Sequence, residues 1–278
     1  MKARAPFILF TLLVITFTYT VFWNQKLTVA ATNPTWNCVD YKFIYIRGSG
    51  QKRYQSSEFK IIKQSLRKKF ESLGYTYELD DLDYPAININ LKTGLGAFVT
   101  AGRSFKYGES VKLGISKLKE DLKQDSAVCK TTRYVAIGYS QGAQVLGDTL
   151  RENLNSSRFL FVAFFGDPQL YLPEARNYDV CSGRDLSIYR KDVIDCKVES
   201  GILGARIPYI PRKYLNKAGT WCNKGDAICG SGINLKNNVA HLQYPQKIKK
   251  FIENLDIGNI TKNNIPVIPI EKPYIYKN

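Results

Sequence analysis

Short apolar runs alternate along this chain with segments whose apolar residues recur at helical spacing. Residues 41–46 (YKFIYI) are rich in β-branched and aromatic side chains and lead into the Gly-containing segment 47–50, so they predict a strand that ends in a tight loop. Residues 56–72 then place apolar side chains every three or four positions, and Gly74 follows them as a helix stop. Together these segments predict one β-loop-α unit.

The same alternation continues to residue 165 and returns near the C-terminus. Two apolar runs, at 134–137 and 159–165, predict further strands, and a less regular stretch within 75–84 predicts another. Helical spacing covers three more segments: 104–122, 143–153 and 248–252. Because strands that alternate with helices favour parallel pairing, we expect an α/β fold with a parallel sheet.

Two stretches lack this pattern. Residues 169–221 are rich in Pro, Tyr and basic side chains, and we expect a loop-rich insertion there. Residues 256–278 are rich in Asn and Pro, which suits an extended strap or a disordered tail rather than a domain. We therefore place one large domain at residues 38–255, a length that can bury a substantial hydrophobic core.

Residues 1–31 have the layout of an export signal. Lys2 and Arg4 precede the apolar run 7–23, and small residues up to Ala31 offer a cleavage site. An uncleaved membrane anchor is the alternative, because the run is at the short end of the length that spans a bilayer. In both cases the rest of the chain is exported, so we expect a secreted or surface-anchored protein.

The cysteines agree with an exported chain. There are six, an even number, and all of them follow the signal segment: Cys38, Cys129, Cys181, Cys196, Cys222 and Cys229. Zinc is the competing use of paired cysteines. The spacing between the last two is wider than zinc sites use, and the chain has one histidine. We therefore expect disulfides and no metal site.

The chain is strongly basic, with a formal charge of +16 that falls to +13 without Lys2, Arg4 and Lys26. A field of this sign favours anionic surfaces such as acidic cell-wall polymers, phospholipid headgroups or nucleic acid. The basic residues are scattered along the sequence, however, and a solvated basic surface also keeps a protein soluble. Since no nucleic-acid motif is present, we expect no nucleic-acid partner and keep an anionic cell-surface polymer as a candidate.

The segment Gly138-Tyr139-Ser140-Gln141-Gly142 lies between a predicted strand and a predicted helix, which is the context of a nucleophile elbow. Such an elbow needs glycines where side chains would clash in a strained turn. Ser140 would then be a nucleophile. The alternative is a plain strand-to-helix turn in which Ser140 caps the helix.

His241 is the only histidine, so no other imidazole could take the proton of Ser140. An orienting carboxylate would complete a triad, and on α/β-hydrolase folds the chain order is serine, acid, histidine. Asp226 fits this order and lies between two nearby cysteines, whose disulfide could fix its loop. Asp192 and Asp195 are alternatives, but neither combines a rigid loop with closeness to His241.

Three more segments complete an ordered set: 47–49 (RGS), 84–86 (YPA) and 165–168 (FGDP). Together with 138–143 (GYSQGA), and with 222–229 (CNKGDAIC) followed by His241, these segments resemble the cutinase-like serine esterases. The resemblance spans roughly residues 38–244.

This resemblance implies a cutinase-like α/β-hydrolase of three layers, with a central, mainly parallel five-stranded sheet and no metal or organic cofactor. Ser140 would be the nucleophile, His241 the base and then the acid, and Asp226 the residue that orients His241. The oxyanion hole would come from the backbone N–H groups of Ser49 and Gln141, with the Ser49 hydroxyl as a third donor.

The resemblance also implies the disulfides Cys38–Cys129 and Cys222–Cys229, which leaves Cys181 to pair with Cys196. The stretch between Pro168 and Cys222 is longer than in compact fungal members of the family. Its aromatic, proline-rich part at 207–214 could cover or extend the site, or form a surface loop without contact to ligand.

These features together predict a monomeric carboxylic ester hydrolase that works through an acyl-enzyme. Its substrate would be a cutin-like polyester, a lipid, an acetylated polysaccharide or a cell-wall ester, and the sequence does not choose among them. Two alternatives remain: an acyltransferase, in which a bound alcohol replaces water, and a non-catalytic basic protein that binds the cell wall.

Overall fold

The structure, a computed structural model, describes residues 37–89, 105–152, 154–171, 201–223, 225–230 and 238–257. The expected export segment 1–31 lies outside the described residues. So do residues 172–200 of the expected insertion, with Cys181, Cys196, Asp192 and Asp195, and residues 258–278 of the expected tail. In the described part of the chain, no helix is both long and apolar enough to cross a membrane.

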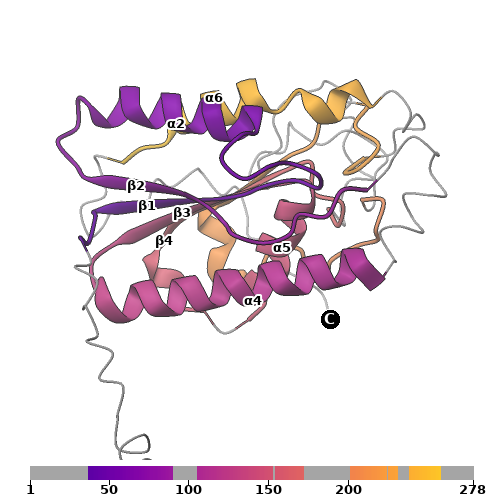
Figure 1. The fold of residues 1–278 in the computed structure, drawn as a ribbon, viewed down its shortest axis with the longest axis horizontal. Helices are drawn as coiled ribbons and strands as arrows, with labels where there is room; N and C mark the ends of the chain where they lie inside the picture. Colours follow the sequence, from indigo (N-terminus) through magenta and orange to yellow (C-terminus); the bar gives the residue numbers. More distant parts are fainter. Residues whose placement is uncertain are drawn as a thin grey trace, which may run out of the picture. The chain divides into compact units, whose positions relative to one another are not determined.

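Five parallel strands form one sheet in the order β2-β1-β3-β4-β5 (Figure 1). The sheet confirms the predicted fold class. The apolar runs at 41–46 and 159–165 are strands with the predicted bounds, because each run ends at a glycine-containing turn. The strands are β1 Tyr41–Ile46, β2 Tyr77–Asp81, β3 Arg133–Tyr139, β4 Phe159–Phe165 and β5 Ala218–Trp221.

Helices cover both faces of this sheet, so the fold has three layers (Figure 1). One face carries α2 and α6, which lie side by side, and the other face carries α4 and α5. The helices are α2 Ser57–Phe70, α4 Phe105–Val128, α5 Gln141–Leu150 and α6 Pro245–Asn254, and the short 3-10 turns are η2 Ser156–Arg158, η4 Arg212–Lys217 and η5 Val239–Leu242.

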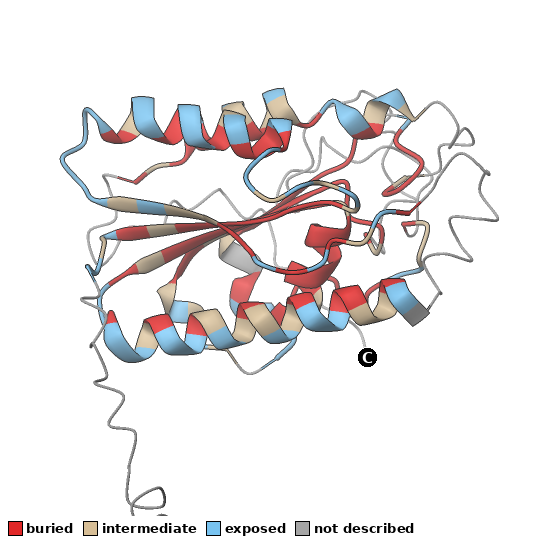
Figure 2. Cartoon of the chain, in the orientation of Figure 1, coloured by how far each residue is buried: buried red, intermediate tan, exposed pale blue. Residues whose placement is uncertain are grey.

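The central strands are buried on both sides, as expected for a sheet between two helical layers (Figure 2). In β1, Phe43 and Tyr45 pack toward α2 and α6, whereas Ile44 and Ile46 pack toward α4 and α5. This alternation follows from the two-residue period of a strand. It explains why the run is apolar throughout.

Helix α2 shows how the sequence sets the outer layer. Its N-cap Ser56 accepts a hydrogen bond from the backbone N–H of Phe59 at 3.1 Å, which satisfies one of the free N–H groups of the first turn. Its apolar residues face the sheet, and its lysines and Arg67 lie on the outer side or at its margin. The helix is therefore amphipathic in the usual sense for a surface helix.

The segment 201–223 differs most from the sequence expectations. It contributes the edge strand β5. The sequence pattern does not predict this strand, because it is only four residues long and lies between η4 and Cys222. Within 207–214, Tyr209 and Tyr214 are buried and pack against Phe164 and Phe159, respectively. These rings therefore fill the core, and Ile207 is the one large apolar side chain of this described segment that is exposed.

Candidate active site

A sharp turn joins the end of β3 to the start of α5, and Ser140 is the single residue between them. Its φ angle is 53°, in a backbone region that residues other than glycine rarely adopt. Its side chain makes no capping hydrogen bond to α5. The hydroxyl is therefore directed away from the helix, and the alternative in which Ser140 caps α5 does not describe this turn.

Two glycines make this turn sterically feasible. A Cβ atom on Gly142 would lie 1.9 Å from the carbonyl oxygen of Ile46, and one on Gly138 would lie 2.6 Å from Cα of Ala143. Both distances are far below van der Waals contact, and the obstructing atoms belong to the backbone. Glycine at these two positions is thus required for α5 to begin directly against β1 and β3.

The structure brings Ser140, His241 and Asp226 into one hydrogen-bonded chain. His241 Nε2 lies 2.9 Å from Ser140 Oγ, and His241 Nδ1 lies 2.8 Å from Asp226 Oδ2. Asp226 is completely buried and His241 is 7% exposed, whereas Ser140 is half-buried. An ionised carboxylate can only accept hydrogen bonds, so the imidazole proton resides on Nδ1 and leaves Nε2 to accept from the serine hydroxyl.

Asp226 is surrounded by donors. Its Oδ1 accepts hydrogen bonds from the backbone N–H of Ile228 at 2.9 Å and from Asn238 Nδ2 at 3.1 Å, and its Oδ2 accepts from the Tyr244 hydroxyl at 2.6 Å as well as from His241. Burial raises the pKa of Asp226, but the electrostatic attraction of His241 and the hydrogen bonds from His241, Tyr244 and Ile228 lower it by more. The net pKa lies below the ordinary 3.8, which keeps Asp226 ionised at neutral pH.

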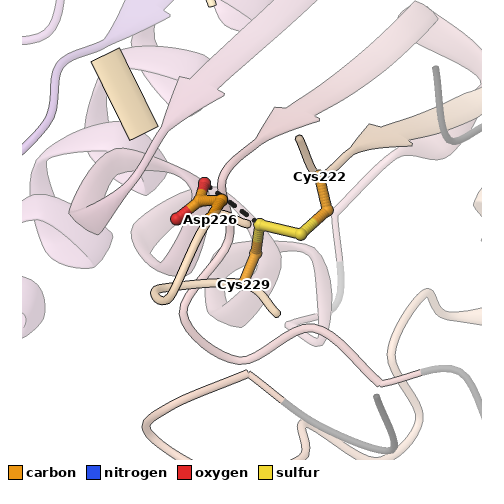
Figure 3. A group of neighbouring side chains, drawn as sticks. All are labelled: Cys222, Asp226 and Cys229. Atoms are coloured by element: carbon orange, nitrogen blue, oxygen red, sulfur yellow. Dashed lines mark hydrogen bonds between the residues drawn. A yellow bond between two sulfur atoms is a disulfide. The ribbon is translucent and has the colours of Figure 1, made fainter. Parts of the chain in front are cut away.

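A disulfide closes the loop that carries Asp226. Cys222 and Cys229 are bonded, and Figure 3 shows the Cys229 sulfur beside the Asp226 carboxylate, at 3.2 Å from Oδ2. A disulfide sulfur carries no proton, so this is a packing contact rather than a hydrogen bond. The three side chains are close enough to suggest a metal site. They do not fit one, because metals bind cysteine as thiolate and both sulfurs are used in the disulfide.

His241 is held in place by Tyr139, the residue before Ser140. The ring of Tyr139 stacks on the imidazole, with centroids 5.1 Å apart, and the Tyr139 hydroxyl donates a hydrogen bond to the His241 carbonyl at 2.7 Å. Just after the neighbouring strand β4, Gly166 has a φ of +62°, and a Cβ atom there would lie 2.8 Å from His241 Cε1. The imidazole therefore occupies a closely fitted space.

The family model for cutinases matches residues 37–255. This chain belongs to the cutinase family. The resemblance seen in the sequence is thus confirmed, and the protein is a carboxylic ester hydrolase, as predicted.

Solved structures with a similar fold include a cutinase-like protein from Cryptococcus sp. and an acetylxylan esterase. The first is 17% identical, with 78% of this chain and 93% of that chain covered and a TM-score of 0.53. The second is also 17% identical, with 78% and 96% covered and a TM-score of 0.53. No curated protein shows significant sequence similarity to the chain. At this identity the structural likeness establishes the fold alone.

In this cutinase-family chain, the segments 47–49 and 84–86 are bound to each other beside the elbow. The Tyr84 hydroxyl donates to the Arg47 carbonyl at 2.5 Å, and the backbone N–H of Gly50 donates to the Ala86 carbonyl at 2.7 Å. A Cβ atom on Gly48 would lie 3.3 Å from Cβ of Ser140. The loop after β1 is therefore pressed against the predicted nucleophile.

Ser49 and Gln141 are the residues predicted to supply the oxyanion hole. Gln141 is the first residue of α5, where the helix leaves its N–H groups unpaired, and among the described residues neither its backbone N–H nor that of Ser49 has a hydrogen-bond acceptor. The Ser49 hydroxyl differs from the expectation. It donates to the Ile87 carbonyl and accepts from the backbone N–H of Ile89 at 3.0 Å, so it is engaged in holding the loop.

Sequence reasoning did not identify Tyr139 and Tyr244 as part of the site. Tyr139 lies within the elbow motif, and Tyr244 lies three residues after His241. Position next to a catalytic motif is the one signal that could have indicated them. The sequence contains 18 tyrosines, however, and nothing in a linear pattern distinguishes these two.

Proposed function

We propose that the protein hydrolyses its ester by nucleophilic catalysis, with Ser140 as nucleophile, His241 as base and then acid, and Asp226 as the carboxylate that orients His241. One observation carries this proposal: the unbroken chain from Ser140 Oγ through the imidazole to Asp226 Oδ2, with contacts of 2.9 and 2.8 Å. A nucleophile within hydrogen-bond reach of a base that is itself oriented by a third group is the arrangement this chemistry needs.

In the first half-reaction, Ser140 Oγ attacks the ester carbonyl carbon and its proton passes to His241 Nε2. Asp226 stabilises the imidazolium that forms, because its charge is already fixed beside Nδ1. The carbonyl oxygen becomes negative and accepts hydrogen bonds from the backbone N–H groups of Ser49 and Gln141. Neither of these two donors has an acceptor among the described residues.

The tetrahedral intermediate then collapses. The bond from carbon to the alcohol oxygen breaks, and His241 gives its proton to the departing alcohol, which leaves an acyl group on Ser140. In the second half-reaction, water attacks this acyl carbon while His241 takes its proton. The bond to Ser140 breaks, the serine recovers the proton, and the carboxylic acid is released.

The rim beside His241 supports a substrate with an apolar part. Leu242 is 67% exposed and Val239 is 58% exposed, and both belong to the η5 turn that carries His241. Such side chains bind alkyl or aromatic groups better than they bind water. A polyester, a lipid or an acylated cell-wall polymer fits this rim, and we place such a substrate outside the cell because the fold contains disulfides. We propose that the protein acts as a monomer.

Single substitutions test the assignment. Ser140→Ala and His241→Ala should each lower kcat for a short-chain p-nitrophenyl ester by roughly four to six orders of magnitude, because the members of a triad act as one unit. Ser116→Ala is the matched control, since Ser116 is exposed on the outer side of α4. It should retain wild-type turnover.

Labelling with a fluorophosphonate provides a second readout. The wild-type protein and Ser116→Ala should each be labelled once, at Ser140, whereas Ser140→Ala should not be labelled. Wild-type turnover in either triad variant would refute the mechanism. A folded wild-type protein that is neither active nor labelled would favour the non-catalytic wall-binding alternative.

A further inference from the structure

The two helical layers differ in charge. On one face of the sheet, α2 and α6 carry eight basic and two acidic side chains, a formal charge of +6. On the other face, α4 and α5 carry five basic and five acidic side chains, a formal charge of zero. Basic residues that are scattered along the sequence are thus gathered by the fold on one side.

The lysines on the two faces also differ in their partners. Among the described residues, four exposed lysines of α2 and α6 have no carboxylate within ion-pair distance: Lys60, Lys63, Lys68 and Lys250. On α4, by contrast, three of the five lysines are paired, with Glu109 at 3.3 Å, Asp121 at 2.7 Å and Glu152 at 3.1 Å. The charge on the first face is therefore not neutralised by the protein itself.

The two helices of this face lie side by side (Figure 1). Lys69 Nζ, near the end of α2, donates hydrogen bonds to the backbone carbonyls of Ile252 and Glu253 at the end of α6, both at 2.9 Å. Burial lowers the pKa of Lys69, as expected for an amine held between two helices. Segments that are far apart in the sequence are thus fixed side by side.

We propose that this basic face, defined by Lys60, Lys63, Lys68 and Lys250, binds an anionic polysaccharide. Both helices begin near the catalytic edge, because α2 follows the loop after β1 and α6 begins one residue after Tyr244. A chain bound along them would hold the site close to the same material. The binding needs neither Ser140 nor His241, so it stands independently of the proposed mechanism.

The apolar residues of the two helices favour a hydrated polymer over a bilayer. In α6, Ile248, Phe251 and Ile252 are buried against the sheet, and α2 likewise turns its apolar side inward. A helix that inserts into a membrane interface needs its apolar face outward, with the charges on the other side. The exposed side chains of α2 and α6 are charged or polar, which suits a solvated carboxylate-bearing chain.

A pair of matched variants tests the location of binding. One variant carries Lys60→Gln, Lys63→Gln, Lys68→Gln and Lys250→Gln, and the other carries Lys106→Gln, Lys112→Gln, Lys119→Gln and Lys123→Gln on α4. Each removes four charges, so the two have the same net charge. Binding to polygalacturonate is measured at two salt concentrations, with neutral dextran as the polymer control and hydrolysis of a soluble ester as the check that both variants are folded.

The basic-face variant should bind polygalacturonate roughly tenfold more weakly than the wild type, and its binding should depend less on salt, because four exposed charge contacts are lost. The α4 variant should stay within about threefold of the wild type. Equal losses in both variants would show that net charge alone matters and would overturn the proposal. The proposal would also be overturned if the wild-type protein bound phosphatidylserine vesicles but not polygalacturonate, or if it bound dextran as tightly as polygalacturonate.

Discussion

A carboxylate with no exposed surface remains ionised in this protein because four donors surround it. Asp226 receives hydrogen bonds from the His241 imidazole, the Tyr244 hydroxyl, the Asn238 amide and the backbone N–H of Ile228. Without them, burial would favour the neutral acid, which could not stabilise an imidazolium. The Tyr244 contact is the shortest of the four, at 2.6 Å.

Tyr244→Phe should therefore weaken both the fold and the reaction. At pH 7 we expect a loss of roughly 1.5–3 kcal/mol in unfolding free energy, the usual contribution of a hydrogen bond to a charged group. If the transition state loses the same free energy when the hydrogen bond to Asp226 is removed, kcat falls by at most roughly ten- to hundredfold. Urea unfolding and turnover of a soluble ester measure the two effects.

The pH dependence distinguishes this role from simple packing. Since the folded-state pKa of Asp226 is lowered, the carboxylate stabilises the fold above its unfolded pKa of about 4, and this stability is lost as the pH falls through the lower folded pKa. The stability difference between wild type and Tyr244→Phe should thus shrink below pH 4.

Tyr45→Phe is the matched control, because the buried Tyr45 hydroxyl donates to the neutral side chain of Gln51 at 2.8 Å. Its stability difference from wild type should stay constant over the same acid range. A Tyr244→Phe deficit that is also constant with pH would contradict the proposed link to Asp226.

At the scale of single residues, the sequence predicted the candidate site residues better than it predicted the contacts around them. Ser140, Asp226 and His241 were identified from a motif, from chain order and from the single histidine, and the structure brings them into contact. Tyr139 and Tyr244 act through contacts across the fold, which no local pattern encodes. The hydroxyl of Ser49 was expected to face the oxyanion, and its engagement with Ile87 depends on a second loop.

Among the elements, the segment before β5 is anchored by a buried ion pair. The side chain of Arg206 is fully buried and bonds to the equally buried Asp167, which follows β4. It also lies over the ring of Tyr209. A Cβ atom on Gly147 of α5 would lie 2.1 Å from Cζ of Arg206, so the glycine makes room for the guanidinium. This clamp ties helix, strand end and segment together.

Arg206→Met should destabilise the protein by about 3–5 kcal/mol, because it leaves the Asp167 carboxylate buried without its partner. Arg53→Met is the control. Arg53 pairs with Asp83 at 3.1 Å, but Asp83 is 63% exposed, so this substitution should cost about 1 kcal/mol or less. Chemical denaturation of both variants measures the difference, and similar losses would show that the buried pair is not a clamp.

Strands with continuous apolar runs were the most predictable elements. The bounds of β1 and β4 agree with the sequence because these strands are buried on both faces. Helix α4 extends to Val128 rather than 122, since its last turns are polar and give no apolar period. Strand β5 was missed because its four residues include Gly219 and depend on pairing with β4.

At the scale of the whole molecule, the two disulfides among the described residues close loops of very different size. Cys38–Cys129 links residues 91 positions apart, whereas Cys222–Cys229 links residues seven positions apart. The first ties the start of β1 to the segment before β3, and the second encloses Asp226. If a disulfide stabilises by limiting the unfolded chain, the longer loop contributes more.

Replacing both cysteines of each pair by serine should therefore separate stability from activity. Loss of Cys38–Cys129 should cost about 5 kcal/mol with little change in kcat below the unfolding temperature. Loss of Cys222–Cys229 should cost about 2 kcal/mol but lower kcat more, because the loop that holds Asp226 is released. Urea unfolding and turnover of each variant test this, and a reversed order in either measurement would contradict it.

The contact between Tyr139 and His241 means that the proposed base takes its position from the residue beside the proposed nucleophile. The stacked ring and the 2.7 Å hydrogen bond make the two reactive groups parts of one rigid unit. A displacement of the elbow would therefore carry His241 with it, so that the distance between Ser140 Oγ and His241 Nε2 would be preserved.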